Sequence, residues 1–297
     1  MKKRLLFLAV FIATAVFGPA IANAQEKEKV VTGTITFLSP STVKVLDEYI
    51  SNQLYTGDNV FSGMNVKLGA LYKKHENLSW DVYFTGYSRA DVMDKLNDLP
   101  TLSNPAKSQN LKCSFYNLGY GTYYHWQFGK KLMLKVGGMF DLYGAMKESV
   151  PDGVNNYMNL EGQMMIKAHT AIKYGWDFKK WALDLRASMN VPVIGIISAD
   201  HPSEPAMSAI VGNDHNIMNP ALNHIFLGFY HNYMSLDYEV SVDFVLKPLT
   251  IFIGFGSTCK WWKAYDLQNI RQINYSTIGV SFDIVSRNKF KSSNKNF

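Results

Sequence analysis

Residues 236–246 read LDYEVSVDFVL, and this stretch decides the fold class. Every second side chain in it is apolar, while Asp237, Glu239 and Asp243 stand at positions between the apolar ones. Successive side chains of a β-strand point to opposite faces, so one face of this strand is apolar and the other is acidic. The stretch therefore predicts a strand that separates an apolar environment from a polar one.

The same period of two recurs along most of the chain. It is clear in residues 78–85, 132–142, 160–176 and 181–191. These runs exceed the five or six residues of an ordinary soluble strand and suit a tilted, membrane-spanning strand of about 10 residues. The pattern predicts an all-β, transmembrane, antiparallel up-and-down β-barrel of about ten strands, an even number that fits bacterial barrels. The expected strands are residues 61–73, 77–90, 111–127, 130–145, 158–176, 180–196, 223–233, 236–246, 249–263 and 272–287.

Residues 30–45 carry a further strand-like pattern, which would add two strands in a twelve-stranded alternative. Short links at 74–77, 128–130, 178–180 and 247–248 predict hairpins, while residues 91–110 and 198–223 predict long loops. Short turns usually face the periplasm and long loops the exterior. With the ten strands above, that rule would leave the C-terminus outside, so the sequence leaves the orientation open.

The N-terminus has the order of a secretory signal peptide. Lys2, Lys3 and Arg4 precede an apolar run over residues 5–17, and Ala22-Asn23-Ala24 follows it. This order predicts cleavage after Ala24, and the apolar run is shorter than the roughly 20 residues that span a bilayer. The expected organisation is a signal peptide at 1–24, a periplasmic lead-in segment at 25–60, an outer-membrane barrel at 61–290 and a polar tail at 291–297.

Charge and cysteine content exclude several classes of protein. Residues 1–24 hold three basic residues and no acidic one, which leaves 27 Lys and Arg against 24 Asp and Glu, a net charge of +3. Both signs are scattered along the chain, whereas a nucleic-acid binder concentrates its basic residues in a patch, so nucleic acid is not an expected partner. The sequence does not decide whether Cys113 and Cys259 form a disulfide, because a bridge requires Cα atoms within about 7 Å of each other.

Aromatic residues cluster near the ends of the expected strands. This arrangement indicates interfacial girdles that flank an apolar belt, although aromatic residues also pack in the cores of soluble sheets. The girdle would favour a membrane barrel over the alternative of a soluble periplasmic β-sandwich that binds a ligand or partner. The expected girdle residues are Trp80, Tyr87, Tyr123, Tyr124, Trp126, Trp176, Trp181, Trp261 and Trp262.

The polar faces of the expected strands carry charges of both signs. In a membrane barrel such residues point into the lumen, where they would form paired ladders across a narrow interior. The expected lumen-facing residues are Asp81, Arg89, Lys135, Asp141, Glu161, Lys167, His169, Asp184, Arg186, Asp237, Glu239, Asp243, Asp283 and Arg287.

A hydrolytic site would need a nucleophile, a base and a group that orients the base. The candidate bases are His125, His169, His224 and His231, of which His125 and His169 are the preferred catalytic candidates. The candidate companions are Ser114, Ser188, Ser241 and Asp184. None forms a local signature such as a nucleophile elbow, so no enzyme activity is expected.

A metal or cofactor site is not expected either. Asp200, His201, Glu204, Asp214 and His215 share one loop, but their spacing does not preset a closed ligand set. The chain has no glycine-rich phosphate loop and no dinucleotide fingerprint.

The last expected strand contains TIGVSFDI at residues 277–284. It resembles the C-terminal signal by which outer-membrane barrels are handed to their assembly machinery, although residues 291–297 extend beyond it. The chain also resembles a family of outer-membrane barrels that is a domain of unknown function, over most of residues 46–285. The pieces that carry this resemblance are residues 46–51 with Tyr55-Thr56-Gly57, Asp152-Gly153 with Asn155-Asn156, Pro192 with Gly195, and Asp266-Leu267. The resemblance implies a location and a fold, not a reaction.

These observations predict a monomeric barrel whose partners are outer-membrane lipid and, during biogenesis, the barrel-assembly machinery. A barrel of about eight strands has room only for its own side chains, so a ten-stranded lumen would be narrow. The expected role is porin-like transport or envelope scaffolding, and a barrel-embedded lipid or peptide hydrolase is the alternative.

Overall fold

The computed structural model describes residues 29–48, 51–57, 63–72, 77–93, 110–129, 131–150, 158–178, 180–198, 225–246, 249–264 and 266–285. In these segments no helix has the length and apolar character needed to cross a membrane. The strands are β1 Lys29–Asp47, β2 Ser51–Gly57, β3 Gly63–Tyr72, β4 Leu78–Met93, β5 Asn110–Phe128, β6 Leu132–Val150, β7 Met158–Asp177, β8 Ala182–Ser198, β9 Ile225–Gly228, β10 Tyr233–Val245, β11 Leu249–Ala264 and β12 Leu267–Val285. The signal peptide and the polar tail expected from the sequence lie outside the described residues.

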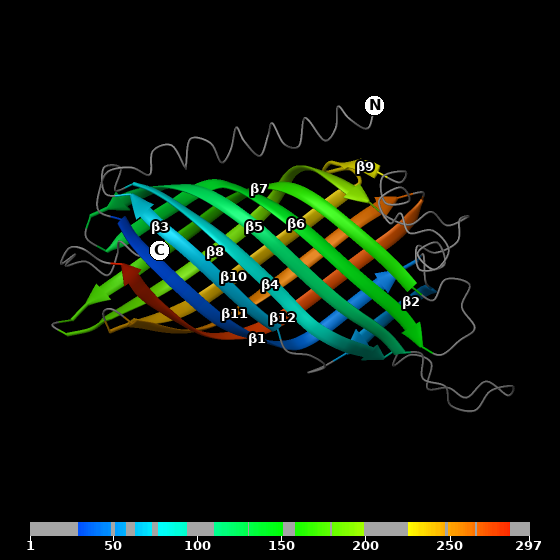
Figure 1. The fold of residues 1–297 in the computed structure, drawn as a ribbon, viewed down its shortest axis with the longest axis horizontal. Helices are drawn as coiled ribbons and strands as arrows, with labels where there is room; N and C mark the ends of the chain where they lie inside the picture. The colour runs from blue at the N-terminus through cyan, green and yellow to red at the C-terminus, as the bar shows by residue number, and fades with distance from the viewer. Residues whose placement is uncertain are drawn as a thin grey trace, which may run out of the picture.

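The strands form one antiparallel sheet that closes on itself. β1 pairs with β12 along one edge and with β2 and β3 along the other, and the wall continues from β4 to β8. β8 pairs with both β9 and β10, and β10 returns to β12 through β11. β2 and β3 share one position in the wall, as do β9 and β10, so the barrel has ten strand positions (Figure 1). The ten-stranded antiparallel barrel predicted from the sequence is confirmed.

The segments that form the ten strand positions differ from the expected segments. Residues 29–47 form β1, so the boundary expected at residue 61 is wrong, and this segment is wall rather than lead-in. The two strands expected at 223–233 and 236–246 occupy a single position, because both pair with β8. The first difference adds one strand position and the second removes one, so the number of positions is still ten.

The corrected membership also puts the end of the last strand at the same end of the barrel as the short links, which removes the conflict found in the sequence. The strand ends that flank residues 73–77, 129–131, 178–181 and 246–248 lie at one end of the barrel, together with the start of β1 and the end of β12. We call this the turn end, at the left of Figure 1. The strand ends that flank residues 48–50, 94–109, 151–157, 199–224 and 265–266 lie at the opposite end, the loop end. Both ends of the described chain therefore lie at the turn end.

The two prolines inside the described strands stand opposite the two interruptions of the wall. Pro40 lies on β1 between the stretch that pairs with β3 and the stretch that pairs with β2. Pro192 lies on β8 between the stretches that pair with β10 and with β9. Proline has no N–H to donate to a ladder, so a gap in the neighbouring strand is a position that accepts it.

Each proline is also next to a β-bulge that reverses which residues point inward. On β8 the register of pairing with β7 shifts between Ile166 and Lys167, leaving Val193 as the extra residue. Burial along β8 accordingly changes from even-numbered positions before the bulge to Gly195 and Ile197 after it. Because strand side chains alternate with a period of two, one inserted residue exchanges the two faces.

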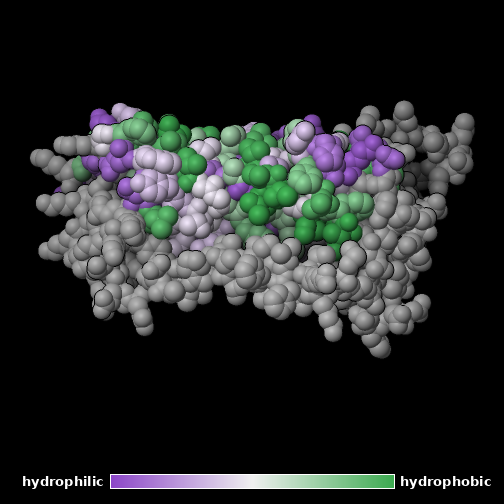
Figure 2. All heavy atoms as spheres, turned by 90° about the horizontal axis from the view of Figure 1, so that it is seen from above, coloured by the Kyte–Doolittle hydropathy of each residue, from purple (hydrophilic) through white to green (hydrophobic). Residues whose placement is uncertain are grey.

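The exterior of the barrel is apolar. Figure 2 shows one face, on which hydrophobic residues cover much of the middle and hydrophilic residues lie toward the two ends. All ten wall positions contribute exposed apolar side chains, among them Phe37, Val66, Phe84, Leu118, Leu142, Ile166, Leu185, Val240, Ile253 and Ile278. A surface of this kind suits the hydrocarbon of a bilayer rather than water. The alternative of a soluble β-sandwich is wrong, because the sheet is closed and its polar face is the inner one.

Aromatic side chains gather on the exterior at the turn end. Tyr124 and Trp126 are exposed neighbours with ring centroids 4.7 Å apart, and Tyr174 and Trp176 repeat this arrangement. Trp181 stacks on the exposed Phe178 at 4.0 Å. Tyr124, Trp126, Trp176 and Trp181 belong to the expected girdle, whereas Tyr174 and Phe178 were not predicted. Three other expected girdle residues lie buried inside the barrel instead, namely Tyr87, Tyr123 and Trp262.

The physical reason for this difference is the parity of each strand. Tyr123 and Tyr124 are consecutive, so they must point to opposite faces, and nearness to a turn does not determine which face is outside. The same parity separates the two cysteines. Cys113 is buried inside the barrel and Cys259 is exposed, and both thiols are free.

We predict that a charge on the apolar belt destabilises the barrel. Ile253 on β11 is 61% exposed in the middle of the belt, so Ile253→Arg should lower the free energy of unfolding in lipid vesicles by about 2–4 kcal/mol. Gln127→Arg is the matched control, because Gln127 is exposed two residues before the turn residue Gly129. Urea titrations of both variants measure the effect, and equal stability of the two would contradict a lipid-facing belt.

Candidate functional site

The lumen contains a cavity of about 310 Å³ that is the candidate site. Its wall includes six cationic side chains, from Lys67, Lys135, Lys167, Arg186, Lys260 and Arg271. It also includes five carboxylates, from Asp81, Asp141, Asp237, Glu239 and Asp243. Solvent reaches part of this wall, since the side chains of Lys67, Glu239 and Arg186 are 33%, 29% and 24% exposed. The cavity is therefore polar, charged on all sides and partly accessible.

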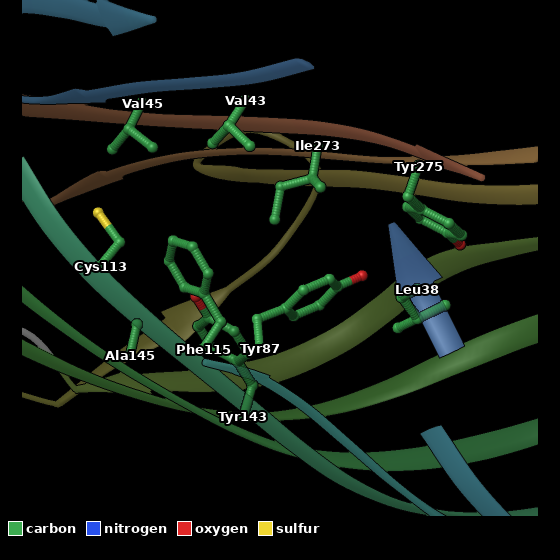
Figure 3. Close-up of a cluster of buried hydrophobic side chains, with 10 residues drawn as sticks. All are labelled: Leu38, Val43, Val45, Tyr87, Cys113, Phe115, Tyr143, Ala145, Ile273 and Tyr275. Atoms are coloured by element: carbon green, nitrogen blue, oxygen red, sulfur yellow. The ribbon is translucent and has the colours of Figure 1, made fainter. Parts of the chain in front are cut away.

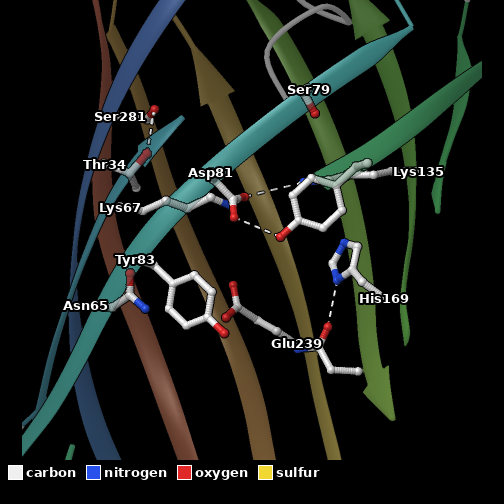
Figure 4. A network of polar contacts seen from close by, with 12 residues as sticks. Thr34, Asn65, Lys67, Ser79, Asp81, Tyr83, Lys135, His169, Glu239 and Ser281 are labelled. Atoms are coloured by element: carbon white, nitrogen blue, oxygen red, sulfur yellow. Dashed lines mark hydrogen bonds and ion pairs between the residues drawn. The ribbon is translucent and has the colours of Figure 1, made fainter. Parts of the chain in front are cut away.

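One network on the wall centres on Asp81 of β4. Its carboxylate lies 2.7 Å from the ammonium of Lys67 on β3 and 3.8 Å from that of Lys135 on β6. The Tyr123 phenol donates a hydrogen bond to the same carboxylate at 2.8 Å, and Lys135 Nζ lies 3.7 Å from the centroid of the Tyr123 ring. Figure 4 shows Lys67 and Lys135 on either side of Asp81. A buried carboxylate with this many donors is well compensated.

A second network links the β4–β7 part of the wall to β10. The ammonium of Lys167 lies 2.5 Å from Asp141 and 2.8 Å from Asp237, and the Tyr83 phenol donates a hydrogen bond to Asp141. Arg186 of β8 lies 3.7 Å from both Glu239 and Asp243 of β10. Every one of these pairs joins different strands, so the networks tie the wall together from inside.

Aromatic side chains in the lumen lie over glycines on the neighbouring strand, and Tyr83 reaches Asp141 in this way. Tyr83, Gly119 and Asp141 are consecutive partners across β4, β5 and β6, and a Cβ on Gly119 would lie 2.2 Å from the Tyr83 ring. Glycine leaves the space through which the phenol reaches Asp141. Five such directly opposed pairs line the lumen: Gly63 with Tyr87, Gly119 with Tyr83, Gly137 with Tyr123, Gly256 with Tyr275 and Gly279 with Phe252.

An apolar cluster adjoins the cavity and extends toward the loop end. Val43, Val45 and Ile273 on β1 and β12 face Phe115 and Ala145 on β5 and β6 (Figure 3). A smaller cluster fills the opposite side, formed by Met165, Ile197, Tyr233 and Trp262. We call these two clusters together the apolar plug.

A buried lysine joins the strands beside the plug. The ammonium of Lys147 on β6 lies 2.8 Å from both Asp47 and Glu161 and 2.9 Å from the Asn269 amide oxygen. Its side chain is 1% exposed. The three partners lie on β1, β7 and β12, so this ammonium joins strands from different sides of the lumen.

The turn end holds a serine–histidine pair. Ser79 Oγ and His125 Nε2 lie 2.5 Å apart, both buried. The other ring nitrogen of His125, Nδ1, contacts the Met133 thioether at 3.4 Å. In a serine hydrolase this nitrogen would be held by a carboxylate. The contact with Met133 therefore occupies the ring nitrogen that the acid of a triad would orient.

The other catalytic candidates are dispersed. His169 Nδ1 lies 2.6 Å from the Asn190 amide oxygen, and its ring packs against Tyr123 rather than against a serine. Ser241 accepts a hydrogen bond from Arg186, and Asp184 pairs with Lys173 at 2.9 Å. His231 is exposed in the link between β9 and β10, far from these groups in the wall. His224 and the acidic and histidine residues of loop 199–224 lie outside the described residues.

Most of the expected lumen-facing residues lie inside the barrel. Ten of them line the cavity or its networks in buried or half-buried positions: Asp81, Lys135, Asp141, Glu161, Lys167, His169, Asp184, Arg186, Asp237 and Asp243. Glu239 lines the cavity as well. The side chains of Arg89 and Asp283, and the whole of Arg287, lie outside the described residues. Most ion pairs join residues on different strands, rather than residues of opposite charge along one strand.

Sequence reasoning missed several of the groups that shape the site. Lys147, Lys260 and Arg271 were not among the expected lumen residues, although each stands at an inward position of its strand. Lys147 could have been found by extending the alternation of 132–142 five residues further. The lumen-facing tyrosines give a weaker signal, a tyrosine on one strand and a glycine on the next, which requires the register to be known.

Comparison with models of known protein families assigns the chain to a family. Residues 4–289 match the model of a family described as a protein of unknown function, DUF3316. The chain belongs to this family. A comparison with curated proteins found no match.

Several solved structures of membrane barrels are similar to the chain. The outer membrane protease OmpT from Escherichia coli is 8% identical, with a TM-score of 0.45 over 88% of this chain and 99% of that one. Neisserial surface protein A (NspA) is 10% identical, with a TM-score of 0.35 over 87% and 100%. The β domain of the Bordetella autotransporter BrkA is 6% identical, with a TM-score of 0.44 over 86% and 100%. Identities and scores at this level carry no argument about activity.

We predict that Gly137 is required for the Asp81 network. A Cβ at this position would lie 2.1 Å from the Thr122 carbonyl oxygen and 2.8 Å from Tyr123 Cα, so Gly137→Ala must displace the β5 backbone. We expect a loss of about 1–3 kcal/mol in the free energy of unfolding. Gly138→Ala is the matched control, since a Cβ there has no heavy atom within 4 Å. An unchanged denaturation midpoint for Gly137→Ala would refute the close packing.

We also predict a large effect of removing the Lys147 ammonium. Lys147→Met leaves Asp47 and Glu161 buried without their cation, which should cost about 3–5 kcal/mol of stability. The control is Lys263→Met, which breaks the exposed pair with Asp266 and should change stability by less than about 1 kcal/mol. Guanidinium titrations compare the two, and similar losses would show that the buried network is not a principal source of stability.

Proposed function

We propose that the protein is an integral outer-membrane β-barrel that holds a small polar solute in a closed lumen, in a transport role, rather than a general diffusion pore. The observation that carries this proposal is the combination of a charged cavity with the apolar plug at one end. Wide aqueous channels need about sixteen strands, and this barrel has ten.

The outer-membrane location rests on the apolar exterior and on closure of the sheet. In lipid every backbone N–H and C=O must find a partner within the protein, which a closed antiparallel barrel provides. The short links and both ends of the described chain lie at the turn end, which is usually the periplasmic end of such barrels. We therefore propose that the loop end faces the cell exterior and that the partly accessible cavity lies on the periplasmic side of the plug.

A hydrolase is the less favoured alternative. It is supported by the hydrogen-bonded pair of Ser79 and His125 and opposed by the thioether of Met133 at the orienting position. An envelope scaffold remains the third candidate, because it needs the exterior alone and makes no use of a charged cavity.

Ion conductance in planar bilayers tests the closed lumen. The wild-type barrel should show no steady conductance, because the plug and the Lys147 network fill its cross-section. The double variant Phe115→Ala with Ile273→Ala removes apolar side chains of the plug and should open a measurable conductance.

The matched control removes the same two residue types from the outer face. Phe37 and Ile278 are exposed and lie opposite each other on β1 and β12, so Phe37→Ala with Ile278→Ala should remain closed. A steady, porin-like conductance of the wild-type barrel would reject the proposal, as would recovery of the protein in the soluble periplasmic fraction.

A further inference from the structure

We propose that the cavity binds the anionic group of a small water-soluble solute, a carboxylate or a phosphate, between Lys260 and Arg271. This inference deepens the proposed function and rests on it for the idea that the lumen holds a solute. It names the class of the solute and the two residues that recognise it.

The two cations are direct neighbours on the inner wall. Lys260 of β11 and Arg271 of β12 are partners in the strand register, both side chains are buried, and both line the cavity. Like charges placed directly opposite each other destabilise a sheet, and burial increases that cost because water no longer screens them. A pair of this kind requires compensation by negative charge.

The protein supplies such compensation to the other cations of the cavity. Lys67 and Lys135 lie within 4 Å of Asp81, and Lys167 and Arg186 lie within 4 Å of two carboxylates each. Within the described part of the chain, neither Lys260 nor Arg271 forms an ion pair. The absence is specific to these two residues and not a general property of the lumen.

Their contacts are aromatic instead. Lys260 Nζ lies 3.5 Å from the centroid of the Tyr143 ring, and Arg271 Cζ lies 4.5 Å from the centroids of both Tyr143 and Phe115. Cation–π contacts orient a cation without neutralising its charge. The rings therefore hold both cations in place and leave their positive charge available to an anion.

Hydrogen-bonding capacity is also left over. Arg271 donates one hydrogen bond from its guanidinium to the Tyr143 phenol, while its buried Nε has no partner among the described groups. The nearby carboxylates are engaged elsewhere, Glu161 with Lys147 and Asp237 Oδ2 with Lys167, each at 2.8 Å. An oxyanion can accept charge-assisted hydrogen bonds from Arg271 and from Lys260, and such bonds are stronger than those between neutral groups.

The size and surroundings of the site define the solute. A cavity of about 310 Å³ lies at the small end of ligand sites, so it accommodates a short organic acid or a small phosphate compound. The closed sheet separates the lumen from the bilayer, which favours a dissolved anion over the headgroup of a lipid. Phe115 and Ile273 also line the cavity, so the solute meets apolar surface on the plug side.

Thermal unfolding and calorimetric titration of the barrel in a zwitterionic detergent test the site. At constant ionic strength, replacing chloride by phosphate or by succinate should raise the Tm of the wild type, and at least one of the two anions should give a measurable Kd. Lys260→Gln and Arg271→Gln should each weaken that Kd at least tenfold and abolish the anion-specific rise in Tm.

Two controls separate this site from general salt effects and from a structural role. Lys263→Gln removes one positive charge from the same strand at a partly exposed position, and it should keep both the Kd and the Tm rise of the wild type. In chloride alone, Lys260→Gln should unfold at the same temperature as the wild type or higher, because it relieves repulsion from Arg271.

Three outcomes would overturn the proposal. The first is absence of binding of both anions to the wild type, and the second is wild-type affinity in Lys260→Gln and Arg271→Gln. The third is a lower Tm of Lys260→Gln in chloride, which would mean that Lys260 pairs internally, with the unpartnered Asp237 Oδ1 as its acceptor. None of these outcomes changes the conductance or the membrane fractionation that test the proposed function, so failure of the two can be told apart.

Discussion

Closure of the sheet is the constraint on which the rest of the structure depends. A wall that faces hydrocarbon must pair its own backbone groups, and it must turn its polar side chains toward the axis. The ten strand positions satisfy the first demand, and the two positions shared by broken strands show how closely it is met. Where β2 gives way to β3, and β9 to β10, the opposing strand carries a proline and a bulge, so the gap falls where one N–H is missing.

Turning the polar faces inward creates a second problem, because charges then share a small volume with little water. Cross-strand ion pairs compensate these charges, and so do phenols that lie over glycines and donate hydrogen bonds to buried carboxylates. Compensation is nearly complete around Asp81, Asp141 and Lys147. Among the described residues, Lys260 and Arg271 have no carboxylate within ion-pair distance, and this local imbalance, rather than the overall charge of the lumen, distinguishes the candidate binding site from the structural networks around it.

Sequence patterns predicted the fold well where strands are long and regular. Alternation at 236–246 and 132–142 indicated both the strands and their inward residues, because a period of two needs no partner to be recognised. The prediction was wrong where the wall is interrupted. Segments 223–233 and 236–246 each look like a strand, and only their common pairing with β8 shows that they share one position. The assignment of Tyr87, Tyr123 and Trp262 to the girdle failed because adjacency to a turn does not define a face.

The sequence by itself determined the architecture: strands of alternating polarity, too long for a soluble sheet, in a number that closes a barrel. It also determined which residues could be charged neighbours inside, since parity follows from position along each strand. Only the tertiary structure decided the register of the strands, and the register determines which side chains lie opposite each other. Lys260 lies opposite Arg271, and Tyr83 crosses Gly119 to Asp141, because consecutive strands align at those residues. The compensation of charge is a property of pairs, and pairs between strands exist only once the strands have aligned.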